Sequence, residues 1–142
     1  MKLSIIIPVL NSHEVVRRQL LHFSRMDLTD CELIIVDDGS DPPLEILENQ
    51  APPLTTILRT NDKRPWTWAL ARNAGARIAR GIYLLMFDVD HIVPGPAIRF
   101  LKNFTGQKVQ FIREFGVLDE NGILTQDRDI LEQYGLPKDK GL

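Results

Sequence analysis

The chain has 142 residues, of which 44% are hydrophobic, and its formal net charge is -2. This length fits one domain, and this hydrophobic fraction excludes a disordered chain. The charge excludes the strongly basic surface that is typical of nucleic-acid-binding proteins. A single cysteine, Cys31, excludes an internal disulfide and is typical of a reducing compartment. Because no apolar run approaches the roughly 18 residues of a transmembrane helix and the N-terminus lacks a signal-peptide pattern, we expect a soluble protein.

Four apolar runs alternate with amphipathic stretches over residues 3–90. Leu3 to Val9 is apolar throughout, which is typical of a strand buried on both faces in a parallel sheet. A helix is expected next, capped by Asn11, and the run 33–36 predicts a second strand. The remaining elements predicted here are a helix from Asp41, a strand over 54–58, a helix over 65–80 and a strand over 82–87. This β-α-β-α-β-α-β order predicts an α/β fold with a mostly parallel sheet flanked by helices.

After residue 90 the sequence predicts shorter helices and strands. After the break at Pro94-Gly95-Pro96, residues 97–104 predict a helix and residues 108–112 a fifth strand. Asn121-Gly122, between two short apolar pairs, predicts a β-hairpin. A last helix is expected over 127–134.

Polar residues follow each of the four apolar runs. They are Asn11 after the first run, Asp37 and Asp38 after the second, Asn61 after the third, and Asp88 and Asp90 after the fourth. The carboxyl ends of parallel strands share one edge of a sheet, and ligands bind there. The sequence therefore favours a ligand site at this edge over unrelated polar loops.

Asp88-Val89-Asp90 ends the most apolar run. In an extended segment the two carboxylates would face the same way, and paired oxygen ligands suit Mn²⁺ or Mg²⁺. The same aspartates could instead serve a turn before Pro94. His91 is either a third metal ligand or a packing residue, because alternation would turn it away from Asp90.

Two further motifs have competing interpretations. In Asp37-Asp38-Gly39-Ser40, a carboxylate can accept a hydrogen bond from a ring N–H of a uracil-like base, but the residues also suit a turn and helix cap. Arg72 offers a fork of donors that fits phosphate oxygens, although a helical arginine is usually solvated surface. Trp66 and Trp68 are interpreted mainly as core residues.

Taken in this order, the clusters resemble the inverting family 2 glycosyltransferases with the GT-A fold. The matching segments are Ser4-Ile5-Ile6-Ile7-Pro8-Val9-Leu10-Asn11, Ile34-Ile35-Val36-Asp37-Asp38-Gly39-Ser40, Ala71-Arg72-Asn73-Ala74-Gly75 and Phe87-Asp88-Val89-Asp90. The resemblance implies one Rossmann-like GT-A domain over 1–142. Residues 1–104 would form its nucleotide-sugar-binding part, and residues 105–142 would begin a truncated acceptor-side region.

The resemblance also implies an activity and roles for residues. The enzyme would transfer a sugar, with inversion, from a nucleotide-diphospho-sugar (most often a UDP-sugar) to a saccharide or lipid-linked acceptor. The backbone around Pro8 and Val9 would lie against the base and ribose, close to the polar ends at Asn11 and Asn61. Asp37 and Asp38 would sit by the base, with Asp38 the better candidate for contact, and Arg72 would lie near the diphosphate. Asp88 and Asp90 would hold the ribose and the bridging Mn²⁺ or Mg²⁺.

The chain departs from the family pattern in two places. Lys63 stands where the family usually has a glycine, and residues 64–68 intervene before the Ala-Arg-Asn motif. Nothing after Phe111 matches the acceptor-binding half that carries the general base, so no catalytic base is assigned. The acidic residues there, none of which we assign, are Glu114, Asp119, Glu120, Asp127 and Asp129.

Two alternatives remain. One is a non-catalytic nucleotide-sugar-binding fragment or subunit that needs a partner. The other is a nucleotidyltransferase, which is disfavoured because Asn11-Ser12-His13-Glu14 stands where those enzymes usually carry a glycine-rich basic loop. The expected location is cytoplasmic, with peripheral attachment to the membrane if the acceptor is a lipid.

Overall fold

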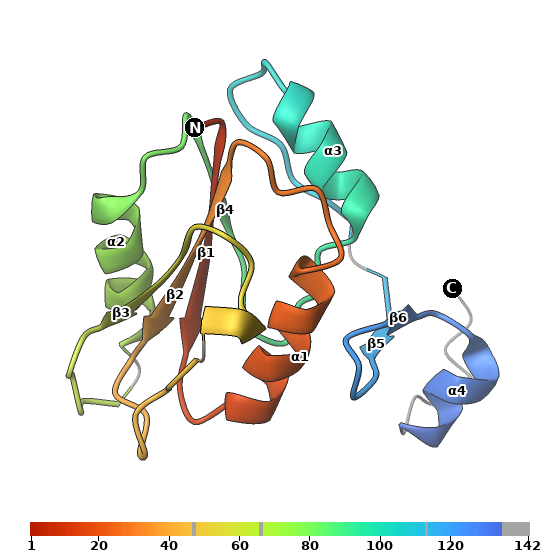
Figure 1. Ribbon diagram of the computed structural model, residues 1–142, viewed down its shortest axis with the longest axis horizontal. Coiled ribbons are helices and arrows are strands. Elements are labelled where there is room, and N and C mark those ends of the chain that lie inside the picture. The colour runs from red at the N-terminus through yellow and green to blue at the C-terminus, as the bar shows by residue number, and fades with distance from the viewer. Residues whose placement is uncertain (47, 66, 113, 135–142) are drawn as a thin grey trace.

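The computed structural model describes residues 1–46, 48–65, 67–112 and 114–134 (Figure 1). At its centre is a four-stranded parallel sheet in the order β3-β2-β1-β4. Its strands are β1 (Leu3–Val9), β2 (Cys31–Asp37), β3 (Thr55–Arg59) and β4 (Tyr83–Met86). The chain runs outward from β1 to β3 and then returns to the other side of β1, so the predicted α/β architecture is confirmed.

Helices cover both faces of this sheet. On one face lie α1 (His13–Phe23) and α3 (Gly95–Asn103), and on the other lies α2 (Trp68–Ile78), as Figure 1 shows. Alternate side chains of β1 enter the two cores: Ile5 and Ile7 pack with Phe23 under α1, whereas Ile6 packs with Ala71 under α2. Burial on both faces explains why β1 is apolar throughout.

The helix α2 lies unusually close to the sheet at Gly75. A Cβ atom at this position would be 2.7 Å from Cγ2 of Ile6 and 3.0 Å from Cγ2 of Val36. The glycine in the Ala71–Gly75 motif therefore has a packing reason, because the helix backbone itself rests on the strands.

The strand β4 differs from the buried strand that its apolar run predicts. Its residues alternate in exposure, and Leu84 and Met86 are 44% and 39% exposed. Both point to the face that α2 covers, but α2 lies over β1 and β2 rather than over β4. A continuous apolar run therefore does not mean burial on both faces here, because an edge strand can keep one open face.

The helix predicted from Asp41 does not form. Among the described residues, this connection holds only the short 3₁₀-helix η1 (Glu48–Gln50). Leu44 is buried, and both of its backbone groups bind side chains from elsewhere: Asp37 Oδ2 accepts from its N–H, and Arg59 donates to its carbonyl. With those groups already paired and Pro42 and Pro43 lacking N–H groups, helix formation gains little.

Beyond α3 the chain forms a smaller unit beside α1. The strands β5 (Val117–Leu118) and β6 (Leu124–Thr125) are antiparallel, which confirms the predicted hairpin, and α4 (Arg128–Gln133) follows. The strand predicted over 108–112 was wrong, since this described segment has no strand pairing. Arg17 and Arg18 of α1 donate to carbonyls of the hairpin. No helix in the described part of the chain is long and apolar enough to cross a membrane.

Candidate functional site

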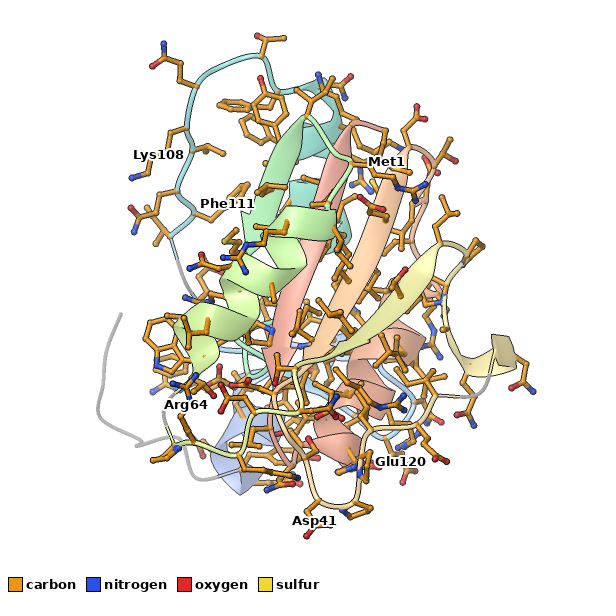
Figure 2. The ribbon with its side chains drawn as sticks, turned by 90° about the vertical axis from the view of Figure 1, so that its left-hand side faces the viewer. Met1, Asp41, Arg64, Lys108, Phe111 and Glu120 are labelled. Carbon is orange, nitrogen blue, oxygen red and sulfur yellow. The ribbon has the colours of Figure 1, made fainter. Side chains whose placement is uncertain are left out.

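The candidate residues gather at the carboxyl edge of the sheet. In Figure 2 the labelled Asp41 and Arg64 lie at this end, opposite Met1 at the amino end of β1. The strand order reverses between β1 and β4, since the chain reaches β4 only after β3 on the far side. Ligands of open α/β sheets bind at such a reversal, outside the carboxyl ends of the strands. Asp88 and Asp90 follow β4 at this point, and Asn11 follows β1.

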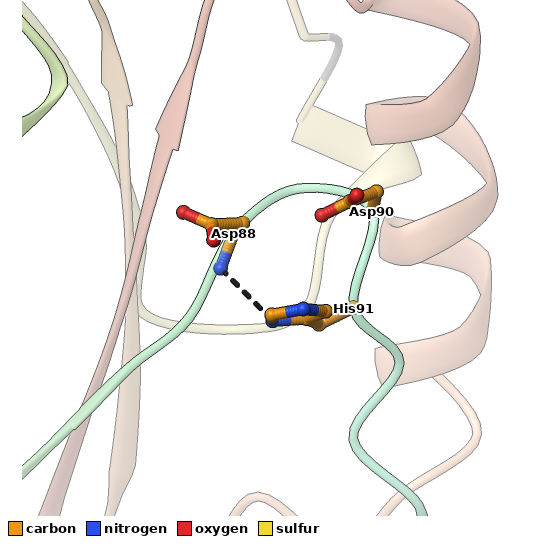
Figure 3. Close-up of side chains that lie close together, drawn as sticks. All are labelled: Asp88, Asp90 and His91. Atoms are coloured by element: carbon orange, nitrogen blue, oxygen red, sulfur yellow. Dashed lines mark hydrogen bonds between the residues drawn. The ribbon is translucent and has the colours of Figure 1, made fainter. Parts of the chain in front are cut away.

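Asp88, Asp90 and His91 lie together on one turn (Figure 3). One ligand atom from each side chain lies within 4.8 Å of the others. The chain here is a turn rather than the predicted extended segment, because the His91 N–H donates to the Asp88 carbonyl at 2.9 Å. The turn brings His91 toward the aspartates, with its Nδ1 3.4 Å from the Asp88 N, so the expectation that alternation would turn it away was wrong.

Arg72 extends from α2 to this turn. Its Nη2 donates to Asp88 Oδ1, and its guanidinium lies over the Trp68 ring, 4.7 Å from the ring centre. The Arg72 Nε is buried without a hydrogen-bond partner among the described residues. Trp68 is 50% exposed, so its interpretation as a core residue was wrong, while Trp66 lies outside the described residues. The arginine is thus fixed beside the acidic turn instead of extending freely into solvent.

Asp37 holds the loop that follows β2. It is 2% exposed, and its two oxygens accept backbone N–H groups of its own loop, Oδ1 from Ser40 at 3.0 Å and Oδ2 from Leu44 at 2.8 Å. Burial raises the pKa of this carboxyl, but the hydrogen bonds from Ser40 and Leu44 and the charge of Arg59 outweigh it, so the pKa lies below its ordinary value. This geometry fits the turn interpretation of Asp37.

Asp38 joins three segments at the same edge. Its Oδ1 accepts from the Thr60 hydroxyl at 3.0 Å and its Oδ2 from the Thr67 hydroxyl at 2.6 Å. Thr60 follows β3 and Thr67 precedes α2, and no local pattern in the sequence indicates either contact. Each oxygen keeps a second lone pair, so the carboxylate can still accept a hydrogen bond from a ligand.

Gly39 lies directly beneath the loop that follows β3. Its φ is +90°, and a Cβ atom here would be 2.2 Å from the Asp62 carbonyl oxygen. Lys63, at the position where the resemblance implies a glycine, donates from Nζ to the Gly39 carbonyl at 3.1 Å, and Arg64 pairs with Asp62. The two loops therefore form a single wall of the site.

Asn11 connects the loop after β1 to the same wall. It does not cap the following helix, although the sequence predicted that it would. Its φ is 49°, its N–H donates to Ser40 Oγ at 3.0 Å, and its Oδ1 accepts from the Asp41 N–H at 2.8 Å. The residue at the start of α1 is Ser12.

Three further candidates lie at the strand ends of this wall. Pro8 and Val9 are buried in β1, where the Val9 carbonyl accepts from the Asp38 N–H at 2.8 Å. Asn61 follows β3 and adopts a φ of 54°. The candidates thus form two groups along one edge, an acidic turn with Arg72 and a loop wall around Asp38.

Two acidic residues beyond α3 have structural contacts. Asp119 Oδ1 accepts the N–H groups of Asn121 and Ile123 in the hairpin, each at 2.8 Å. Asp127 caps α4 by accepting from the Asp129 N–H at 2.9 Å. Their carboxylates stabilise local turns.

Residues 4–107 match the family described as Glycosyl transferase family 2. The chain belongs to this family, which confirms the resemblance found in its sequence. It is 36% identical over 112 residues to a poly(ribitol-phosphate) beta-glucosyltransferase of Bacillus spizizenii, covering 74% of this chain and 17% of that protein. It is 33% identical over 103 residues to a cholesterol galactosyltransferase of Borreliella burgdorferi, covering 72% of this chain and 28% of that protein. The chain thus spans less than a third of either relative.

Solved structures share the fold. S. aureus TarS 1-349 superposes with a TM-score of 0.60 at 26% identity, covering 70% of this chain and 30% of that one. The same TarS segment in complex with UDP gives a TM-score of 0.56 at 20% identity, covering 82% of this chain and 40% of that one. At that identity the second likeness shows the fold alone.

Proposed function

We propose that this chain binds the donor of a metal-dependent, inverting glycosyl transfer, with a UDP-sugar as donor and a saccharide or lipid-linked acceptor. The observation that carries the proposal is the acidic turn Asp88–His91 at the strand-order reversal, with Arg72 beside it, in a chain of glycosyltransferase family 2. A diphosphate needs a cation and hydrogen-bond donors; the turn offers ligands for the cation, and Arg72 offers the donors.

The donor set of the turn fits Mn²⁺ or Mg²⁺. Two carboxylates and one imidazole are ligands that Mn²⁺ accepts, and Mg²⁺ prefers the carboxylates. Ligands at about 2.1 Å from an octahedral ion lie about 3–4 Å apart, and the three ligand atoms already lie within 4.8 Å of one another. When bound, the cation would supply charge neutralisation to the departing nucleoside diphosphate.

The chain's own residues would bind and orient the donor. Arg72 presents a planar fork of donors next to the turn, and its remaining N–H groups can bind phosphate oxygens. Asp38 has lone pairs available for a ring N–H of the base, at a wall formed by the loops after β1, β2 and β3. Sugar transfer with inversion requires the acceptor hydroxyl to attack opposite the diphosphate, and no described residue is assigned as its base.

Calorimetric titration with UDP, with and without Mn²⁺, tests the donor site. We expect binding that depends on Mn²⁺, and we expect Asp88→Asn and Asp90→Asn each to weaken it while leaving thermal unfolding unchanged. Asp30→Asn, at an exposed aspartate before β2, is the matched control. Mn²⁺-dependent binding that is unchanged in both site variants would remove the turn from the proposal.

A second candidate is a nucleotide-sugar-binding subunit that transfers nothing by itself. It is favoured by the structural contacts of Asp119 and Asp127, whose carboxylates accept backbone N–H groups of their own turns. Release of UDP from a UDP-sugar by the isolated chain with an acceptor would contradict it. Intact Mn²⁺-dependent UDP binding with no release for any acceptor would favour it.

A further inference from the structure

Two polar side chains of α1 are buried against the segment that carries the acidic turn. Gln19 is 3% exposed, and its Nε2 donates to the carbonyls of Val89 at 3.1 Å and His91 at 2.5 Å. His22, one helical turn further along α1, is 7% exposed, and its Nε2 lies 2.9 Å from the Val93 carbonyl oxygen. These contacts join residues about seventy positions apart, as the sequence numbers show.

The orientation of both groups is fixed by chemistry. A carbonyl oxygen only accepts hydrogen bonds, so Gln19 must turn its NH₂ group toward the two carbonyls, and His22 must carry a proton on Nε2. The Gln19 Oε1 is buried and has no partner within the described residues. A flipped amide would place that oxygen against two other acceptors, which is unfavourable.

Ordinary packing does not account for these two residues. The same face of α1 carries Val16, Leu20 and Phe23, all buried and apolar. An apolar side chain in place of Gln19 would avoid the cost of burying an amide whose oxygen stays unpaired. The amide gains instead two hydrogen bonds to a segment that has no regular secondary structure.

We propose that Gln19 and His22 are positioning residues for the metal ligands. Through the carbonyls of residues 89, 91 and 93 they hold the Asp88–His91 turn against α1. The helix lies beside this turn in Figure 3. The inference rests on the proposed metal-dependent function. It adds to that function the two residues that set the geometry of the site.

The turn needs such support. Asp88 and Asp90 are exposed, and residues 88–91 form a turn, with a hydrogen bond from the His91 N–H to the Asp88 carbonyl, rather than a helix or strand. Exposed loops of this kind are mobile unless other elements hold them. Residues that orient metal ligands from the next layer typically change metal affinity by about 10–100-fold.

The first test measures Mn²⁺ affinity in the presence of UDP by calorimetry. Gln19→Met keeps the length of the side chain and removes both donors, and we expect it to weaken Mn²⁺ binding at least about tenfold. His22→Leu should weaken it as well, whereas His22→Gln, which keeps a donor near the position of Nε2, should restore most of the affinity. Val15→Met, at a 41% exposed position of α1, is the control and should bind as the wild type does.

The second test needs no ligand. Hydrogen exchange of residues 87–93 in the free protein should become faster in Gln19→Met and His22→Leu, while β1 and β2 keep their protection. This readout separates the two proposals: a wild type that binds no Mn²⁺ with UDP would refute the proposed function, and the exchange data would still test the positioning role. Wild-type exchange at residues 87–93 in both variants would overturn the positioning role. A loss of protection that extends equally to β1 and β2 would show a purely structural role and would overturn it too.

Discussion

Replacing Asp37 by asparagine turns one acceptor into a donor at a site where both carboxylate oxygens accept backbone N–H groups. Oδ1 accepts from Ser40 at 3.0 Å and Oδ2 from Leu44 at 2.8 Å, and the side chain is 2% exposed. The asparagine keeps one of these bonds, without its charge, and leaves the other N–H facing an NH₂ group. Hydrogen bonds to charged groups contribute about 1.5–3 kcal/mol, and a buried unpaired donor costs about 1–3 kcal/mol. The free energy of unfolding at pH 7 should therefore fall by about 3 kcal/mol.

The loss should depend on pH. The native pKa of Asp37 lies below the unfolded value of about 3.9, because the hydrogen bonds and Arg59 outweigh the effect of burial. A carboxylate with a lowered native pKa stabilises the fold above the unfolded pKa, and this contribution is lost as the pH falls through the native pKa. The wild type should thus lose stability below about pH 4, and the difference from Asp37→Asn should shrink there.

Urea unfolding at pH 7 and at steps down to pH 3 measures both effects. In thermal unfolding the same loss would lower Tm by about 10 °C, since about 1 kcal/mol corresponds to about 3–4 °C for a chain of this size. Asp30→Asn, an exposed aspartate just before β2, should unfold as the wild type does. The reasoning is refuted if Asp37→Asn stays within about 1 kcal/mol of the wild type at pH 7, or if the difference is the same at every pH.

Three further changes test packing and charge at other points. Gly75→Val should lower the free energy of unfolding by about 2 kcal/mol in urea, because a Cβ would already lie 2.7 Å from Cγ2 of Ile6. Glu32→Gln should lower the free energy of unfolding by about 2 kcal/mol. The Glu32 carboxylate is 5% exposed and accepts from the Ser4 hydroxyl and the Arg80 backbone N–H, each at 2.6 Å. Arg72→Lys should weaken Mn²⁺-dependent UDP binding about tenfold, or about 1.4 kcal/mol by calorimetry, because an ammonium lacks the planar fork that stacks on Trp68.

The sheet could be predicted because its signals are local. The run from Leu3 to Val9 matches β1 residue for residue, since burial on both faces leaves an unbroken apolar stretch. The polar residues after each run mark a shared edge, because parallel strands end there together. The gathering of the candidate residues at that edge follows from the same geometry.

The errors arose where distant contacts decide the outcome. The helix expected from Asp41 fails because Asp37 and Arg59 bind both backbone groups of Leu44, a contact that no local pattern contains. No local pattern singles out Gln19 or His22, because their partners lie about seventy positions away along the chain. A sequence pattern reports the face of a helix that is apolar, but it does not report a polar side chain that is buried against a loop.

Helices on both faces of the sheet contact the acidic turn. The contact from α2 should couple the effects of Arg72 and Asp88 on binding. Arg72 from α2 occupies one oxygen of Asp88, and α1 holds the backbone that follows. Because a carboxylate has two oxygens, Asp88 can bind the guanidinium with one and a cation with the other, whereas Asp90 has no such contact with Arg72 among the described residues. Arg72→Lys should therefore weaken Mn²⁺-dependent UDP binding less in the Asp88→Asn background than in the Asp90→Asn background. Equal losses in the two backgrounds would show that Arg72 and Asp88 act independently.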